Sequence, residues 1–282
     1  MIGYVLAARL AASATAALLL ATPLSAQSWR TLDVARQLHD SGTYTVTVQY
    51  GAGRLALHAT ESPLLYDMRL RYDAERTEPV HSFSPGSRTI RLGVRKQHVR
   101  LRDDENPAEL QVDLADRVPL DLSLELGAVE ADLDLSRLRL NDLQVESGAS
   151  EATLRFDSPN PEQMRSMRLD VGAASLKAVR LVNANTRNIQ VNAGVGTVDL
   201  DLGGDWRQDI ALNVEVAVGG VRVHVPSDVG VRVEMRKVLA SFEHDGLVKR
   251  GGAYFSDNWD SAPYKLSIRT GTTLGKFELD RR

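Results

Sequence analysis

The chain has 282 residues, with 34 Lys and Arg against 37 Asp and Glu, a formal net charge of −3, and no cysteine. This slightly acidic balance argues against nucleic acid, and against an anionic membrane surface, as the main partner. The lack of cysteine excludes a disulfide framework and a lipid-bearing cysteine behind a signal sequence.

Residues 1–26 have the pattern of a secretory signal peptide. Arg9 is the only charge, an Ala/Leu-rich run follows, and the stretch Pro23–Ala26 ends in a small residue before Gln27. An uncleaved membrane anchor is the alternative, but the run is short, rich in alanine and followed at once by polar sequence. We therefore expect an exported protein, periplasmic or secreted, with no membrane span after signal cleavage.

Residues 27–110 are expected to form an N-terminal cap and the first, loop-interrupted β coils. Residues 29–39 have a modest helical pattern that suggests a helix covering the first coil. The segment 44–58 alternates apolar and polar residues around Gly51, and a further copy of the pattern follows Gly86. Its wider spacing indicates inserted loops.

One pattern is repeated five times between residues 118 and 225. Each copy alternates with period two, and the phase of the apolar residues reverses at a glycine, as between Leu126 and Ala131. A reversed phase keeps the apolar face inward while the chain turns a corner, and glycine accepts unusual backbone angles. The pivots are Gly127, Gly148, Gly172, Gly194 and, with alanine in place of glycine, Ala217.

A fixed period of this length predicts a solenoid. Further phase changes in the first copy suggest about three straight runs per copy, and hence roughly triangular coils of about 22 residues that stack about 4.8 Å apart. The predicted fold class is therefore all-β, a single-stranded β-helix with terminal caps, over residues 111–282.

The C-terminal part is expected to add a sixth coil after Pro226 and an irregular stretch over residues 243–263. The chain then closes with a strand pair around Gly271 and Gly275. If these final strands are uncovered near Phe277 and Leu279, self-association through an end strand is possible, because an edge strand is a template for pairing.

Charged residues occur at equivalent outward positions of successive coils. Two acidic pairs, Asp132 with Asp134 and Asp199 with Asp201, suggest acid–base work or calcium, but other coils carry basic residues there. The basic residues are Arg155, Lys177, Arg222 and His224. Ordinary cross-strand ion pairing is the preferred interpretation.

No catalytic, cofactor or metal site is predicted. The six histidines lack the spacing of metal ligands, and no phosphate-loop, nucleophile-elbow or zinc-protease motif is present. Four asparagines between residues 183 and 192 favour a stacked ladder in the solenoid over glycan recognition. Three aromatic residues expected outside the alternating strands, Trp206, Tyr254 and Trp259, are a possible binding surface, with capping of a coil as the alternative.

The segments at 118–156, 188–206 and 218–233, with a similar N-terminal region at 44–73, resemble the bacterial toast-rack group of putative adhesins, which is related to LiaF-type cell-envelope stress proteins. The resemblance implies a right-handed β-helix, export to the envelope and no enzymatic residues. LiaF-type proteins usually carry several membrane helices, which this chain lacks.

These observations together predict an exported, non-catalytic β-helix protein of the cell envelope, an adhesin or binding scaffold for an unknown envelope or extracellular ligand, either glycan or protein. The alternative is a carbohydrate-active β-helix enzyme, a polysaccharide lyase or hydrolase. That reading requires reactive residues along one groove, and Asp134, Arg155 and Lys177 are the nearest candidates.

Overall fold

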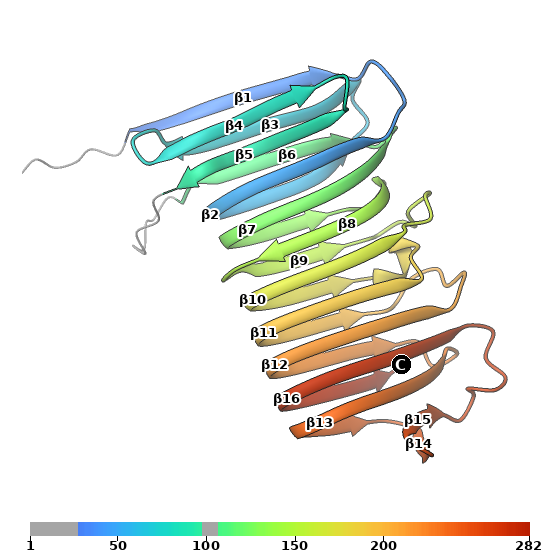
Figure 1. Cartoon of the computed structure of the whole chain (residues 1–282). Coiled ribbons are helices and arrows are strands. Elements are labelled where there is room, and N and C mark those ends of the chain that lie inside the picture. The colour runs from blue at the N-terminus through green and yellow to red at the C-terminus, as the bar shows by residue number, and fades with distance from the viewer. Residues whose placement is uncertain (1–27, 98–106) are drawn as a thin grey trace, which may run out of the picture.

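The protein is an array of β-strands, and the all-β prediction is confirmed (Figure 1). The computed structural model describes residues 28–97 and 107–282. The predicted signal peptide, residues 1–26, lies outside the described residues. The strands are β1 (Trp29–Gln37), β2 (Tyr44–Thr60), β3 (Leu64–Asp73), β4 (Thr77–Ser84), β5 (Thr89–Gln97), β6 (Glu109–Ala115), β7 (Pro119–Asp134), β8 (Arg139–Ser147), β9 (Glu151–Arg155), β10 (Ser166–Val179), β11 (Asn188–Asp201), β12 (Ile210–Val225), β13 (Gly230–His244), β14 (Leu247–Arg250), β15 (Ala253–Ser256) and β16 (Lys265–Arg281).

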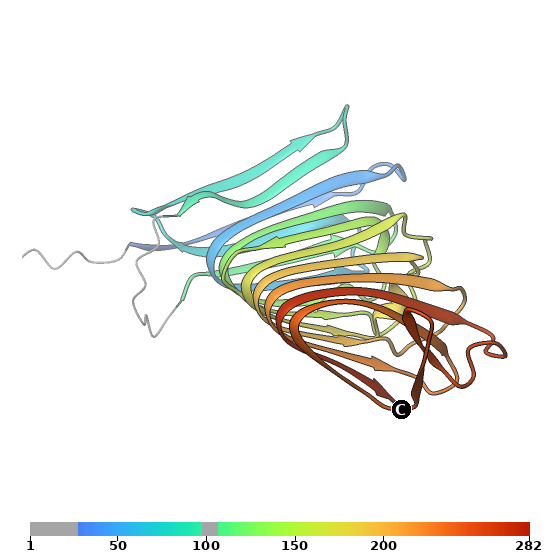
Figure 2. The same cartoon turned by 60° about the horizontal axis from the view of Figure 1, so that its bottom comes forward.

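Most coils are one long strand folded at its middle into two arms, and the bends nest one behind the other in Figure 2. Neighbouring coils pair in parallel, so that Met167 of β10 faces Ile189 of β11, and Ile189 faces Leu212 of β12. The steps are 22 and 23 residues, which matches the predicted period. The fold is therefore a β-helix-like solenoid, as predicted.

The core is built from the alternate residues that point between the two arms. One inward column in the second arm crosses coil after coil with every member at 0–1% exposure. The column consists of Leu57, Leu133, Leu154, Ala178, Leu200, Val223 and Leu279. A single coil cannot bury such a face alone, so the stack provides the core collectively.

Glycine occurs at the corner for two different reasons. The sequence analysis attributed the pivot glycines to unusual backbone angles, and this was wrong. Gly127 needs no unusual φ; a Cβ added there would lie 2.1 Å from the carbonyl oxygen of Gly51 in the next coil. The pivots are therefore selected for close approach of backbones. The unusual backbone angle falls two residues later, as at Gly219 with φ 144°.

The third side of the coil is loop, where the sequence suggested a third straight run. It contains the 3-10 helix η1 (Leu181–Ala184) and one isolated bridge between Met164 and Thr186. On this side the buried side chain of Asn160 satisfies backbone groups of the neighbouring coil. Its amide accepts from the Leu140 N–H at 3.0 Å and donates to the Leu140 carbonyl oxygen at 2.8 Å. Asn183 donates to the Phe156 carbonyl oxygen at 2.8 Å, and Asn185 donates to the Asn160 carbonyl oxygen at 3.2 Å. These two asparagines bridge neighbouring coils, whereas Asn188 and Asn192 of the predicted ladder lie in β11.

The N-terminal end splits into two layers above β2. β7 pairs with β2 on one side, while on the other side β5 pairs with the first half of β2 and β6 with its second half. The predicted helix at 29–39 is wrong: β1 is an antiparallel edge strand on β3, where pairing and the half-buried Leu32 and Val34 override a weak helical pattern.

The position of Gly86 and the expected boundary at residue 110 also differ from the observed strands. Gly86 is no corner, because it lies in the turn between the antiparallel strands β4 and β5. The sequence-based boundary between 27–110 and 111–282 falls inside β6, which pairs with both β2 and β3.

The C-terminal end has a strand order that differs from the chain order. β16 is a single folded strand that lies between β12 and β13 and pairs with both in parallel (Figure 1). Phe277 and Leu279 are therefore internal and buried, and the predicted exposed final strand is wrong. The end coil is β13, and the predicted irregular stretch contains the hairpin β14–β15, whose strand β15 pairs with Arg232 and Val233.

Candidate binding surface

A groove of about 550 Å³ crosses the outer face of the second arm near the N-terminal end. Its lining comes from β1, β3, β6, β2, β7 and β9, which are consecutive neighbours in this arm. Ala56 and Gln111 face each other across β2 and β6, and the small Ala56 side chain leaves room between longer charged neighbours. The groove therefore runs across strands, along the stack.

Ion pairs between neighbouring strands organise the walls of the groove. Arg54 Nε lies 3.1 Å from Glu130 Oε2, and Arg155 lies 2.9 Å from Asp132 Oδ1. Each pair joins outward side chains of adjacent strands, the geometry that favours opposite charges across a sheet. These contacts hold the charged groups in place, and each charge is already paired with an opposite charge of the protein.

Arg69 and Arg71 of β3 complete the wall toward β1. Arg69 Nε donates to Asp33 Oδ1 at 2.7 Å, and this hydrogen bond raises the pKa of the guanidinium. The Arg71 guanidinium lies 4.3 Å from the ring centroid of Trp29 and donates to the Pro107 carbonyl oxygen at 3.1 Å. Both arginines are thus fixed in orientation, which lowers the entropy lost on binding a ligand.

Beside the groove, burial raises the pKa of Asp113, and the nearby charge of Asp67 adds to this effect. His58 opposes the shift, with Nδ1 3.7 Å from Asp113 Oδ1. Neither residue lines the groove. The shift therefore reflects packing of the sheet rather than a group turned toward a ligand.

One member of each predicted acidic pair makes the expected cross-strand ion pair, whereas Asp134 and Asp201 accept backbone N–H groups. Asp132 pairs with Arg155, and Asp199 lies 3.3 Å from His224 Nε2, while His224 Nδ1 lies 3.1 Å from Asp280. Arg222 lies 3.3 Å from Glu278 instead of an aspartate. Within residues 28–97 and 107–282, no group of three or more His, Asp and Glu side chains has metal-binding geometry.

The candidates for the enzyme alternative do not share one groove. Arg155 lines the groove at β9, whereas Lys177 lines a separate hollow with Asp199, Asp201 and His224. Asp134 lines neither, and its Oδ1 accepts the backbone N–H of Ser136 at 3.0 Å in the turn after β7. The three side chains therefore form no reactive set.

The three aromatic candidates have separate surroundings. Trp206 packs against the core and donates from Nε1 to the Leu202 carbonyl oxygen at 3.1 Å. Tyr254 lies in β15, with its ring centroid 5.0 Å from that of Phe242 over the end coil. Trp259 packs edge-on against Phe255 at 5.6 Å. Each ring therefore packs on other parts of the chain, and a binding role for these three residues stays a prediction.

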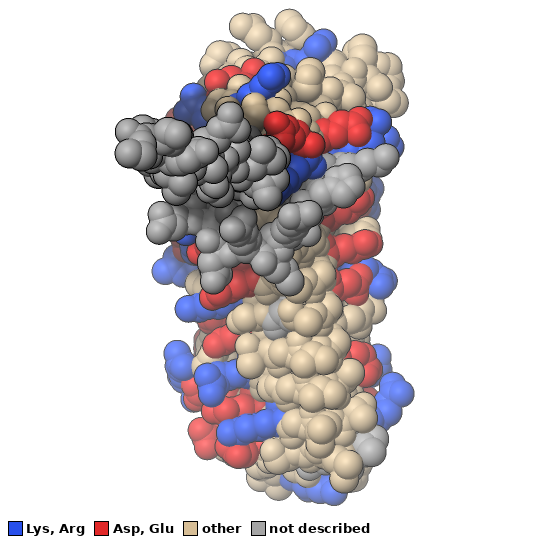
Figure 3. Space-filling model, turned by 90° about the vertical axis from the view of Figure 1, so that its left-hand side faces the viewer, with Lys and Arg blue, Asp and Glu red and all other residues tan. Residues whose placement is uncertain are grey.

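An apolar ridge, defined as Val195, Val218, Leu274 and Leu239, runs along the corner at one register position. The four side chains are 55%, 41%, 48% and 72% exposed. Figure 3 shows this edge as an uncharged band with acidic and basic side chains on both sides. Four exposed apolar side chains in succession form a continuous apolar strip on the surface.

Sequence reasoning missed the groove. Its residues come from strands that are far apart in the chain, such as Arg54, Arg69 and Glu130, and only the pairing order brings them together. The available signal was the outward charge alternation in each of these segments.

The chain matches the family model described as the N-terminal domain of toast_rack, DUF2154, over residues 25–177 and 160–224. The chain belongs to this family. No curated protein matches its sequence. No helix in the described ranges is long and apolar enough to cross a membrane.

Several solved structures resemble this toast-rack protein. A "putative cell adhesion protein" from Clostridium sporogenes is 15% identical with a TM-score of 0.47, covering 90% of this chain and 100% of the other. A "putative adhesin" from Bacteroides fragilis is 8% identical with a TM-score of 0.41, covering 90% and 98%. A "putative lipid binding protein" from Parabacteroides distasonis is 9% identical with a TM-score of 0.32, covering 90% and 96%.

Proposed function

We propose that this toast-rack protein is an exported, non-catalytic protein of the cell envelope that binds a glycan or protein ligand on the outer face of its second arm. The observation that carries the proposal is the groove over Ala56, in which three of the four lining arginines are held by carboxylates of adjacent strands. Fixed, mutually paired charges suit recognition of a polar ligand. They do not suit general acid–base catalysis, which needs a free group with a tuned pKa.

Membership of the toast-rack family and the pattern of residues 1–26 support a binding role outside the cytoplasm. The rigid stack also supports it, because a site built on paired strands loses little entropy when it binds.

The test is a binding screen of residues 27–282 against purified glycans and cell-wall fractions, with product analysis of every polymer. We expect saturable binding without cleavage. Ala56→Arg should abolish binding by filling the groove floor, whereas Thr197→Arg, on the same arm in β11 outside the groove, should leave binding unchanged. Cleavage of a polymer, or equal binding by both variants, would contradict the proposal.

A further inference from the structure

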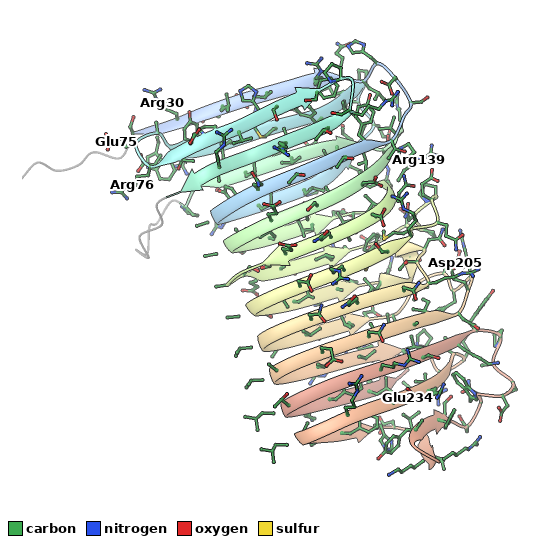
Figure 4. The ribbon with its side chains drawn as sticks, in the orientation of Figure 1. Arg30, Glu75, Arg76, Arg139, Asp205 and Glu234 are labelled. Atoms are coloured by element: carbon green, nitrogen blue, oxygen red, sulfur yellow. The ribbon has the colours of Figure 1, made fainter. Side chains whose placement is uncertain are left out.

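A second pocket, of about 400 Å³, lies at the opposite end of the solenoid, and four of its eleven lining residues are arginines. It opens beside the end coil β13, where Figure 4 labels Glu234 close to the hairpin β14–β15. Four guanidinium groups from three strands line it: Arg232 and Arg236 from β13, Arg250 from β14 and Arg269 from β16. No pattern in the sequence predicted that these three strands would be neighbours.

The pocket keeps an excess of positive charge. Only two carboxylates line it, and Glu234 contacts both Arg232 and, at 3.3 Å, Arg269. The ion-pair partner of Arg250 is Asp260 at 3.5 Å, which does not line the pocket and is 82% exposed. Arg236 has no ion pair within 4.0 Å among the described residues. A chain of net charge −3 thus concentrates arginine at one place.

One polar group in the lining lacks an acceptor. Arg232 Nε is buried and has no hydrogen-bond partner among the described residues. Buried donors are nearly always satisfied in folded proteins, so this N–H calls for an explanation. An oxygen-rich anion held by the arginines would provide an acceptor there.

The arginines are also oriented by an aromatic ring. The Arg232 and Arg250 guanidiniums lie 5.7 Å and 5.9 Å from the ring centroid of Phe255. Such contacts restrict the guanidinium planes before a ligand arrives.

We propose that the pocket formed by Arg232, Arg236, Arg250 and Arg269 binds the phosphate group of an anionic ligand. A carboxylate offers two coplanar oxygens and is matched by a single guanidinium fork. A phosphate offers more oxygens, directed tetrahedrally, and so accepts from several guanidiniums at once. This pocket presents several guanidiniums from different strands.

Two sources present such a phosphate, a soluble ester and a phospholipid headgroup. The apolar ridge bears on the second source, because Leu239 lies three residues after Arg236 on β13. At about 3.3 Å per residue, the end of the ridge is within about 10 Å of the pocket along the strand. A membrane surface would thus meet apolar side chains and arginines together.

The test uses residues 27–282 in phosphate-free, low-salt buffer. Calorimetry with glycerol phosphate, and with acetate as the carboxylate probe, covers the soluble source; co-sedimentation with phosphatidylglycerol vesicles, against phosphatidylcholine vesicles, covers the lipid source. The test variant is the double substitution Arg236→Gln with Arg250→Gln. The control is Arg30→Gln, an exposed residue of β1 at the other end of the stack (Figure 4).

We expect the double variant to bind the phosphate ligand at least about tenfold more weakly, since hydrogen bonds between charged groups are strong. Arg30→Gln should bind like the unmodified chain, and circular dichroism should show the fold intact in both. Glycerol phosphate binding without vesicle binding identifies a soluble source, and selective binding of phosphatidylglycerol vesicles identifies a headgroup; either outcome supports the pocket.

Three outcomes would overturn the proposal: no binding of either phosphate probe, unchanged binding in the double variant, or acetate binding as tight as that of glycerol phosphate. Failure here leaves the groove proposal untouched, because the groove lies at the other end of the solenoid and shares no lining residue with this pocket.

Discussion

Replacing Gly219 by alanine tests how the corner determines the stability of the solenoid. A Cβ at Gly219 would lie 1.9 Å from the carbonyl oxygen of Gly196, whereas ordinary contact begins near 3.4 Å. The residue also has φ 144°, a region that costs a non-glycine residue about 1–3 kcal/mol. Because β11 and β12 are hydrogen-bonded on both arms, neither backbone can withdraw without breaking pairs.

We therefore expect Gly219→Ala to lower the free energy of unfolding by about 4 kcal/mol, a large effect for one methyl group. For a chain of this size, the thermal midpoint should fall by about 10 °C. The matched control is Gly220→Ala. A Cβ there meets no atom within 4 Å, so stability should be unchanged or slightly higher. Urea and thermal unfolding of both variants measure the difference. Midpoints that agree within experimental error would refute the close-approach reasoning.

Two further predictions concern the loop side and the C-terminal strand. Asn160→Ala should cost about 3 kcal/mol in urea unfolding, because backbone groups of Leu140 lose their partners in a buried site, whereas exposed Asn188→Ala should cost less than about 0.5 kcal/mol. Hydrogen bonds from Arg282 and His224 lower the pKa of Asp280. A carboxyl whose folded pKa is lowered stabilises the fold above its ordinary pKa of about 3.9, and this contribution is lost as pH falls through the lowered value. Asp280→Asn should therefore lower the thermal midpoint at pH 7, with the difference from the unmodified chain shrinking below pH ~4; a constant difference down to pH 2.5 would count against this assignment.

The periodic segments were predictable because one pattern encodes their burial. In residues 188–201 the apolar residues alternate, reverse phase near Gly194, and become the inward faces of both arms of β11. Contact between outward charges of adjacent coils was predictable for the same reason. The partners were not, because Asp132 contacts Arg155, which directly faces Asp134. The helix expected at 29–39 failed because its apolar residues fit both periods weakly, and pairing with β3 decided between them.

The sequence by itself determined the all-β class, the period and which side chains of the periodic segments point inward, because alternation and a fixed repeat are local properties of the chain. Tertiary structure alone decided the order of the strands at both ends. β13 and β16 carry the same alternating pattern, so nothing local places β16 next to β12. Both candidate pockets depend on such long-range pairing: the groove combines β3, β6 and β2, and the arginine pocket combines β13, β14 and β16. Such sites form only when particular strands become neighbours. The free energy that selects these neighbours comes from the packing of whole strand faces and not from any single segment.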